Sequence, residues 1–234
     1  IDHLVLEVGA DGVRVKDARL VQLGAQEWPP SSKVAEIAGR YSAVIEELMG
    51  RQVGECPDAL RRVRGGVRSS TLGNWITDAM RAATNADVAI HNKTGIRADL
   101  EGGKVAVRGL YEVAPFDNTL VVVELTGQQL WDLMDNAAAE DRTFLEASGI
   151  KLRYNLKAEA GKRVEELLVG GKAIDLKKSY KVVTNSFLAT GGDGHVIFTR
   201  GPHTTDGKLL RDVLIDTLSG PVGCVADKSA RIAD

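Results

Sequence analysis

The sequence predicts an α/β (α+β) fold, a layered domain in which a mixed β-sheet is flanked by helices. Apolar runs at 119–125 and 179–185 have the length and composition of buried strands. Stretches between such runs, for example 72–84 and the segment that follows Thr126, carry apolar residues at helical spacing. Strands that alternate with amphipathic helices are typical of layered domains containing both element types.

The composition is that of an ordinary globular protein of 234 residues, with 44% hydrophobic and 26% charged side chains. A formal net charge of -2 and scattered arginines give no sign of a nucleic-acid polymer or a membrane surface as partner. No apolar run is long enough to span a bilayer, so no membrane insertion is expected. The four histidines are isolated and the two cysteines are far apart, so no metal site is expected in this chain.

Three parts are predicted along the chain: short strands over 1–30, a linker helix within 31–53, and a main domain over 54–234. The helix should begin after a serine N-cap and end at Gly50. Its apolar residues recur at helical spacing, so one face is expected to pack. The chain also begins without Met, which suggests a fragment or a processed product whose first strands belong to something upstream.

The main domain alternates helices and strands. A helix over 72–84 precedes a short buried strand over 87–90. Thr126 and Gln129 have the spacing of a capping box, which predicts a helix directly after strand 119–125. Further elements are then expected in this order: a strand over 150–156, a hairpin turning at Gly170–Gly171, a strand over 179–185 and a last helix over 206–218.

Polar side chains with reach follow the buried strand 87–90. Asn92 and Arg97 lie in the loop there, and Gly95 marks a special backbone position. Side chains at the end of a buried strand commonly face a ligand crevice. The alternative is that Asn92 caps a turn and Arg97 is a solvated surface residue.

Two aromatic residues and one acid lie in two further loops. Phe187 precedes the glycine-rich turn 191–194, whose glycines are expected to take positive φ and to bring the backbone close to a bound group. That turn contains Asp193. Phe116 lies in the loop ahead of strand 119–125. In the alternative interpretation both rings belong to the core and Asp193 caps its turn.

Together these side chains form the inventory of a nucleoside monophosphate site. The arginines Arg68 and Arg97 can pair with phosphate oxygens. The two rings can sandwich a base, with stacking worth about 1–3 kcal/mol. An amide can read a ring nitrogen, and a carboxylate can accept hydrogen bonds from both ribose hydroxyls. Nothing in this inventory can cleave a phosphate ester, so no catalytic residue is predicted here.

Long motifs carry a family resemblance that extends over about residues 54–230. The motifs LYEVAPFDNTLVVVELTGQQLWDLMDNA and SFLATGGDGHVIF resemble the carboxy-terminal domain of the 5'-nucleotidase family, which includes UDP-sugar hydrolases and cyclic-nucleotide phosphodiesterases. LGNWITDAM and HNKTGIRADL fit the same pattern. The resemblance implies a recognition domain that binds a nucleotide or nucleoside.

The resemblance also implies an upstream metallophosphatase domain, absent from this chain, that holds two divalent metal ions and the catalytic His-Asp pair. Residues 1–30 would be its last strands, and the helix within 31–53 would be the connection about which the two domains rotate. This chain alone would then be inactive. Family members are mostly periplasmic, cell-surface or secreted, which favours a disulfide between Cys56 and Cys224 over two free thiols.

The resemblance assigns roles by motif position: base stacking to Phe116 and Phe187, the ribose hydroxyls to Asp193, a base contact to Asn92, phosphate to Arg68 and Arg97, and close approach of the loop to Gly95. The chain departs from the family pattern at two points. Lys93 and Thr94 replace glycines of an NGGGIR-like loop, which restricts the loop and adds a charge, so ligand preference is expected to differ. Ser69 replaces an acid, which leaves the pairing of its loop open.

Other functions compete with a nucleotidase. The substrate can be another phosphoester, such as a UDP-sugar or a cyclic nucleotide, or a small sulfur compound as in the family's thiosulfate branch. The chain can also be a non-catalytic module that binds a nucleoside or a protein, or a purely structural domain. Phe116 and Phe187 discriminate, because a nucleoside needs both rings and a small sulfur compound does not.

Overall fold

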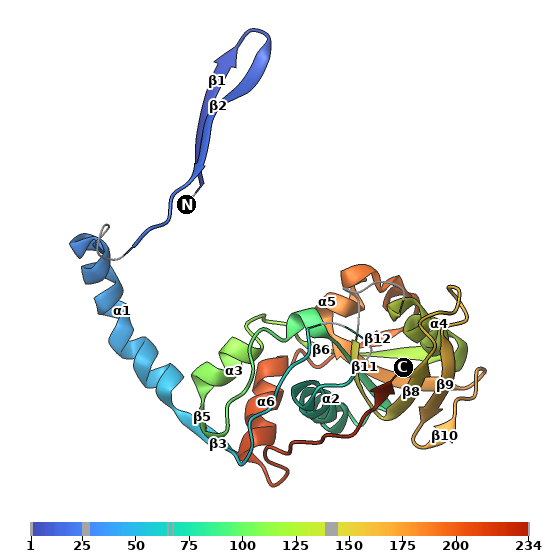
Figure 1. The fold of residues 1–234 in the computed structure, drawn as a ribbon. Coiled ribbons are helices and arrows are strands. Elements are labelled where there is room, and N and C mark those ends of the chain that lie inside the picture. The colour runs from blue at the N-terminus through green and yellow to red at the C-terminus, as the bar shows by residue number, and fades with distance from the viewer. Residues whose placement is uncertain (1, 25–28, 65, 67, 139–144, 234) are drawn as a thin grey trace. The chain divides into compact units, whose positions relative to one another are not determined.

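The computed structural model describes residues 2–24, 29–64, 66, 68–138 and 145–233, and the chain divides into two compact units, 1–48 and 49–234. The first unit contains an antiparallel hairpin of β1 (Asp2–Gly9) and β2 (Gly12–Leu20), and most of helix α1 (Ser32–Gly50) (Figure 1). The predicted strands and helix are therefore present.

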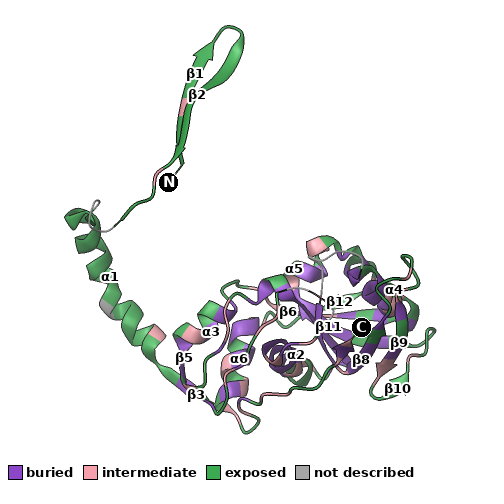
Figure 2. Cartoon of the chain, viewed as in Figure 1, coloured by how far each residue is buried: buried purple, intermediate pink, exposed green. Residues whose placement is uncertain are grey.

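The predicted packing of one face of α1 is not made within the described part of its own unit. Val34, Tyr41 and Leu48 are exposed, and so are most side chains of the hairpin (Figure 2). A single helix and a two-stranded hairpin are too small to enclose a core of their own.

The second unit is built on a mixed five-stranded sheet, as predicted. Its strands lie in the order β12 (His203–Thr204), β6 (Leu120–Thr126), β11 (Ser179–Asn185), β4 (Val88–Asn92) and β7 (Leu145–Ser148). The central pair, β11 and β4, is parallel, and the other pairs are antiparallel.

Both faces of this sheet are buried, and alternate residues point into separate cores. Val88 and Ile90 of β4 belong to one core, whereas Ala89 between them belongs to the other. Val182 and Val183 of β11 divide in the same way. The two-residue period of a strand thus explains why these strands read as continuous apolar runs.

Different layers cover the two faces (Figure 1). One core is closed by helices and a small antiparallel sheet: α2 (Thr71–Thr84), α3 (Val107–Val113), α6 (Leu210–Ser219), β3 (Gln52–Cys56) and β5 (Gly103–Ala106). The other core is closed mainly by a helix and a second sheet: α4 (Gly127–Ala137), β10 (Lys172–Ala173), β9 (Val164–Val169), β8 (Ile150–Tyr154) and β13 (Ile232–Ala233).

Local sequence signals fix several of these boundaries. The capping box at the start of α4 is confirmed: the Gln129 N–H donates to Thr126 Oγ1 at 3.2 Å, and the Thr126 N–H donates to Gln129 Oε1 at 2.8 Å. The hairpin between β9 and β10 turns at Gly170 and Gly171, whose φ angles are 57° and 79°. Both signals act over a few residues, which is why the sequence reveals them.

Three loops meet at one edge of the five-stranded sheet. The parallel strands β4 and β11 both end there, at Asn92 and Asn185. Strand β6 runs the other way, with Leu120 opposite Asn185, so the chain entering β6 lies at the same edge. Short helical turns continue from these ends: η1 (Lys93–Gly95), α5 (Ser186–Ala189), η2 (Gly192–Gly194) and η3 (Val196–Arg200).

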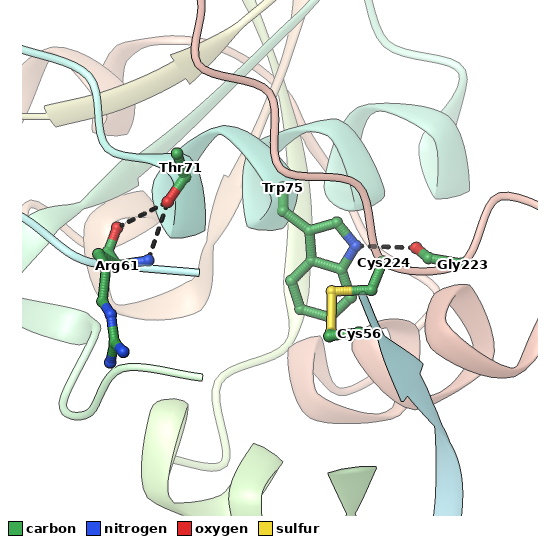
Figure 3. Close-up of a disulfide and its surroundings, with 6 residues drawn as sticks. All are labelled: Cys56, Arg61, Thr71, Trp75, Gly223 and Cys224. Atoms are coloured by element: carbon green, nitrogen blue, oxygen red, sulfur yellow. Dashed lines mark hydrogen bonds between the residues drawn. A yellow bond between two sulfur atoms is a disulfide. The ribbon is translucent and has the colours of Figure 1, made fainter. Parts of the chain in front are cut away.

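A disulfide joins Cys56 at the end of β3 to Cys224 in the segment after α6, with the Cα atoms 4.9 Å apart (Figure 3). Both cysteines are buried. The Trp75 indole lies beside the bond, and its Nε1–H donates to the Gly223 carbonyl at 3.0 Å. The structure therefore contains a disulfide, whereas the residues alone were compatible with either a disulfide or two free thiols.

Candidate functional site

A cavity of about 280 Å³ lies at the sheet edge where the three loops meet. It is lined by Asn92, Thr94, Gly95, Arg97, Phe116, Asn118, Phe187 and Asp193. Three larger hollows, of about 790, 480 and 430 Å³, lie elsewhere in the described part of the chain. The aromatic residues that line the first two, Tyr180 and Trp75, are buried, and the third has no aromatic residue in its lining, so none of the three offers an exposed ring to a ligand.

The structure brings together every predicted site residue except Arg68. Arg68 lies in the segment before α2 and outside the cavity lining, and its carbonyl accepts a hydrogen bond from the Lys93 ammonium. Two lining residues were not predicted, Thr94 and Asn118. The sequence feature that could have identified Thr94 is its place in a loop where the family pattern has glycine. For Asn118 that feature is an amide side chain two positions after Phe116.

The two aromatic rings are exposed. Phe116 is 49% and Phe187 is 43% exposed, so the interpretation of either as a core residue is wrong. Phe187 lies directly on the glycine turn, because a Cβ built on Gly192 would be 2.5 Å from its ring. Gly191 and Gly194 take positive φ as predicted, at 89° and 82°. Gly192 does not, and its lack of a side chain instead makes room for the ring.

Asp193 is held by a chain of amides that starts at the ends of both parallel strands. The Asn185 side chain accepts from the Leu188 N–H at 2.9 Å and donates to Asn92 Oδ1 at 2.9 Å. The Asn92 amide in turn donates to Asp193 Oδ2 at 2.9 Å. Thr94 Oγ1 also lies 2.9 Å from Asp193 Oδ2. Asp193 itself has a left-handed φ of 53°, so the turn aims its carboxylate at the loop after β4.

These hydrogen bonds engage both the oxygen and the nitrogen of the Asn92 side-chain amide. Its oxygen accepts from Asn185, and its nitrogen lies 2.7 Å from Thr94 Oγ1 as well as within reach of Asp193. The residue is only 5% exposed. In this structure Asn92 therefore supports Asp193, and the less buried Asn118 presents the other amide of the cavity.

The expectation that Lys93 adds a charge to the ligand loop is wrong. The Lys93 ammonium points into the protein, donates to the carbonyls of Gly66 and Arg68, and lies 3.8 Å from Glu146 Oε1. Both charged side chains are almost fully buried. Lys93 therefore ties the loop after β4 to the segment before α2.

Glu146 completes this buried group. It accepts from the Ser70 hydroxyl at 2.6 Å and from the Ser70 N–H at 3.2 Å. Burial raises the pKa of the Glu146 carboxyl, an effect that the Lys93 charge and the Ser70 hydrogen bonds oppose. Burial likewise lowers the pKa of the Lys93 ammonium, and the Glu146 charge opposes that shift.

Ser69 has a structural partner where the family pattern has an acid. Its hydroxyl oxygen accepts from the backbone N–H groups of Arg231 and Ile232, at 3.1 and 3.0 Å. The pairing that the sequence left open is therefore made with the segment that enters β13.

No metal-binding cluster is found in the part of the chain that the structure describes, where the criterion is three or more neighbouring His, Cys, Asp or Glu side chains. Across the described helices, none is long and apolar enough to cross a membrane.

Comparisons with known proteins agree with the motifs. The family model described as the C-terminal domain of 5'-nucleotidase matches residues 52–200. The trifunctional nucleotide phosphoesterase protein YfkN of Bacillus subtilis is 35% identical over 182 residues, covering 71% of this chain and 12% of that protein. A 5'-nucleotidase of Vibrio cholerae is 28% identical over 198 residues, covering 82% of this chain and 35% of that protein.

A solved structure shows the same fold. The 5'-nucleotidase precursor from Thermus thermophilus superimposes with a TM-score of 0.79 and 28% sequence identity, covering 95% of this chain and 47% of that one. The chain thus spans less than half the length of these three proteins. The family model covers most of the chain, and the chain therefore belongs to the family of 5'-nucleotidase carboxy-terminal domains.

Proposed function

We propose that the cavity binds the nucleoside part of a nucleoside phosphate, and that the chain is the substrate-recognition part of a 5'-nucleotidase-type phosphohydrolase. The observation that carries this proposal is the meeting of two exposed rings and one oriented carboxylate in a single cavity. A flat aromatic base and a sugar hydroxyl are the groups that such a set recognises. The names of the relatives, which include a nucleotide phosphoesterase and a 5'-nucleotidase, support it.

Each lining residue receives a role in this proposal. The base stacks between Phe116 and Phe187, and the Asn118 amide offers it a donor and an acceptor. Asp193 accepts from the sugar. Gly95 lets this part of the cavity wall pack closely on β4, because a Cβ there would lie 2.7 Å from the buried His91 ring and 3.0 Å from Asn92 Oδ1.

The phosphate is assigned to the two predicted arginines. Arg97 lies on the cavity wall, and its guanidinium donates to the Thr94 carbonyl at 3.2 Å, which leaves further N–H groups for an anion. Arg68 lies outside the lining, so we assign it to phosphate oxygens that project beyond the cavity. A guanidinium suits this task because its paired N–H groups match two oxygens of one phosphate.

Hydrolysis is assigned to a different part of the protein. We propose that 1–30 are the last strands of a metallophosphatase domain, that 31–53 hold the linker helix, and that 54–234 are the recognition domain. Two divalent metal ions in the upstream domain would supply Lewis-acid chemistry and an activated water. The disulfide is consistent with a periplasmic, cell-surface or secreted protein.

Calorimetric titration with adenosine and AMP tests the proposal. We expect dissociation constants of tens of micromolar to millimolar, because much of a closed site is missing. Phe187→Ala should weaken binding about 5- to 150-fold, since one stacking face is worth about 1–3 kcal/mol. Tyr41→Ala, which removes an exposed ring of the first unit, should leave affinity unchanged.

The same solutions test whether hydrolysis belongs to the upstream domain and not to this chain. With Mg²⁺ or Mn²⁺ added, phosphate release from AMP should not exceed the rate in buffer. Equal affinity of wild type and Phe187→Ala would contradict the assigned pocket, and turnover by the pure chain would contradict the assignment of chemistry to an upstream domain.

A further inference from the structure

We propose that Thr94 makes this cavity tolerant of 2'-deoxyribose, because its hydroxyl occupies a position on Asp193 that a second sugar hydroxyl would otherwise fill. The inference rests on the proposed function, and it specifies the class of nucleoside that the site accepts. It starts from the one residue of the loop after β4 that both lines the cavity and bonds the acid.

The direction of the Thr94 hydroxyl is fixed by its neighbours. Its oxygen lies 2.7 Å from the Asn92 amide nitrogen, which can only donate. Its oxygen also lies 2.9 Å from Asp193 Oδ2, which can only accept when ionised. The hydroxyl has one proton, so it accepts from Asn92 and donates to Asp193.

One oxygen of the carboxylate is thereby filled. Asp193 Oδ2 accepts from Asn92 and from Thr94, both at 2.9 Å, and a carboxylate oxygen has two lone pairs. The hydrogen bonds that the Asp193 carboxylate makes within the described chain both end on Oδ2, which leaves Oδ1 for a ligand in the cavity that Asp193 lines.

This arrangement changes which hydroxyl groups of a ribose the Asp193 carboxylate can bind. A vicinal diol engages a carboxylate best with one hydroxyl on each oxygen. A hydrogen bond to a charged group contributes about 1.5–3 kcal/mol, so a site that uses both hydroxyls favours ribose over 2'-deoxyribose by about 10- to 150-fold. With Oδ2 filled by Thr94, the 3'-hydroxyl on Oδ1 is sufficient, and loss of the 2'-hydroxyl costs little.

The backbone of this loop does not depend on the Thr94 hydroxyl. Lys93, the preceding residue, anchors the turn through the Gly66 and Arg68 carbonyls, and the Ile96 N–H closes it on the Lys93 carbonyl at 3.1 Å. Thr94 itself is exposed. Its side chain can therefore be changed without unfolding the loop, and the Asn92 bond continues to hold Asp193.

Titration of wild type, Thr94→Ala and Thr94→Ser with adenosine and 2'-deoxyadenosine tests the inference. The wild type and Thr94→Ser, which keeps a hydroxyl, should bind the two nucleosides within about threefold of each other. Thr94→Ala frees a lone pair of Oδ2, so its preference for adenosine should rise at least about fivefold. Unchanged melting temperatures check that all three chains are folded.

The outcomes separate the two proposals. A wild-type preference for adenosine of tenfold or more, or no change of preference in Thr94→Ala, overturns the role of Thr94 while the nucleoside site stands. Failure of the wild type to bind either nucleoside at millimolar concentration overturns the proposed function itself, and this inference with it.

Discussion

At the scale of single residues, Glu146 connects the segments that support the cavity. Its carboxylate accepts hydrogen bonds from Ser70 at the start of α2 and lies close to Lys93 in the loop after β4. Gly73 leaves room for it, because a Cβ there would lie 2.2 Å from the Glu146 carboxyl carbon. One buried acid thus joins three segments that are distant in sequence, and removing either charge alone would take away the opposite charge that lies 3.8 Å from the other.

His91 gives the fold a defined response to acid. Burial lowers the pKa of its imidazole from 6.5 to about 4, and its Nδ1 is 2.8 Å from the Asn92 carbonyl, so Nδ1–H donates in the neutral form. The folded chain therefore binds fewer protons than the unfolded chain between pH 4 and 6.5. The contribution of His91 to the free energy of unfolding is fully present above pH 6.5, and about 3 kcal/mol of it is lost as the pH drops to about 4.

Urea unfolding at pH 7 and pH 4.5 measures this response. His91→Gln should lose less stability than the wild type over that interval, and His3→Gln, in the exposed hairpin, should match the wild type. The comparison between variants is needed because the raised pKa of Glu146 has the opposite sign and adds stability as pH falls. An identical loss in His91→Gln and wild type would show that His91 is not the cause.

The site residues that the sequence predicts are marked by nearby residues, whereas those that only the structure reveals depend on partners that are distant in the chain. Phe116, Phe187 and Asp193 are visible in the sequence because Phe116 follows Pro115, Asp193 lies within the glycine turn 191–194, and Phe187 precedes that turn by a few residues. The inward turn of Lys93 is not visible, because its partner Glu146 lies on a strand far along the chain. The support given by Asn185 is hidden for the same reason.

At the scale of elements, the sequence predicts those with strong local patterns. The helix α2 and the strands β6 and β11 fall close to their predicted ranges, whereas α6 begins at Leu210, four residues after its predicted start. The strand β13 has two residues and is defined only by its parallel pairing with β8, which no local pattern can reveal. The order of strands in the sheet also depends on contacts between distant segments, so it too required the structure.

The disulfide is expected to contribute strongly to the stability of the second unit. It closes a loop of 168 residues between β3 and the segment after α6. The chain-entropy relation gives about 5 kcal/mol for a loop of this length. Urea unfolding of the oxidised chain, the reduced chain and the Cys56→Ala/Cys224→Ala double variant measures it.

Both the reduced chain and the double variant should unfold at clearly lower urea than the oxidised chain. The reductant should have no further effect on the double variant, which serves as the control. Equal midpoints for the oxidised and reduced chains would show that the bond does not contribute.

At the scale of the whole molecule, the second unit has the parts that the proposed recognition role needs. The mixed sheet is buried on both faces, so its edge positions three loops rigidly. The cavity lies at the ends of two parallel strands, the place where open sheets with helical cover commonly bind ligands. The family resemblance and the sheet geometry thus lead independently to the same set of loops.

The most direct measurement is a crystal structure of the chain with adenosine bound. We expect the base between Phe116 and Phe187, and the sugar within hydrogen-bond distance of Asp193 Oδ1 with Thr94 still on Oδ2. Adenosine in another hollow, such as the one lined by Trp75, with the rings of Phe116 and Phe187 uncovered, would contradict the assignment of this cavity as the nucleoside site.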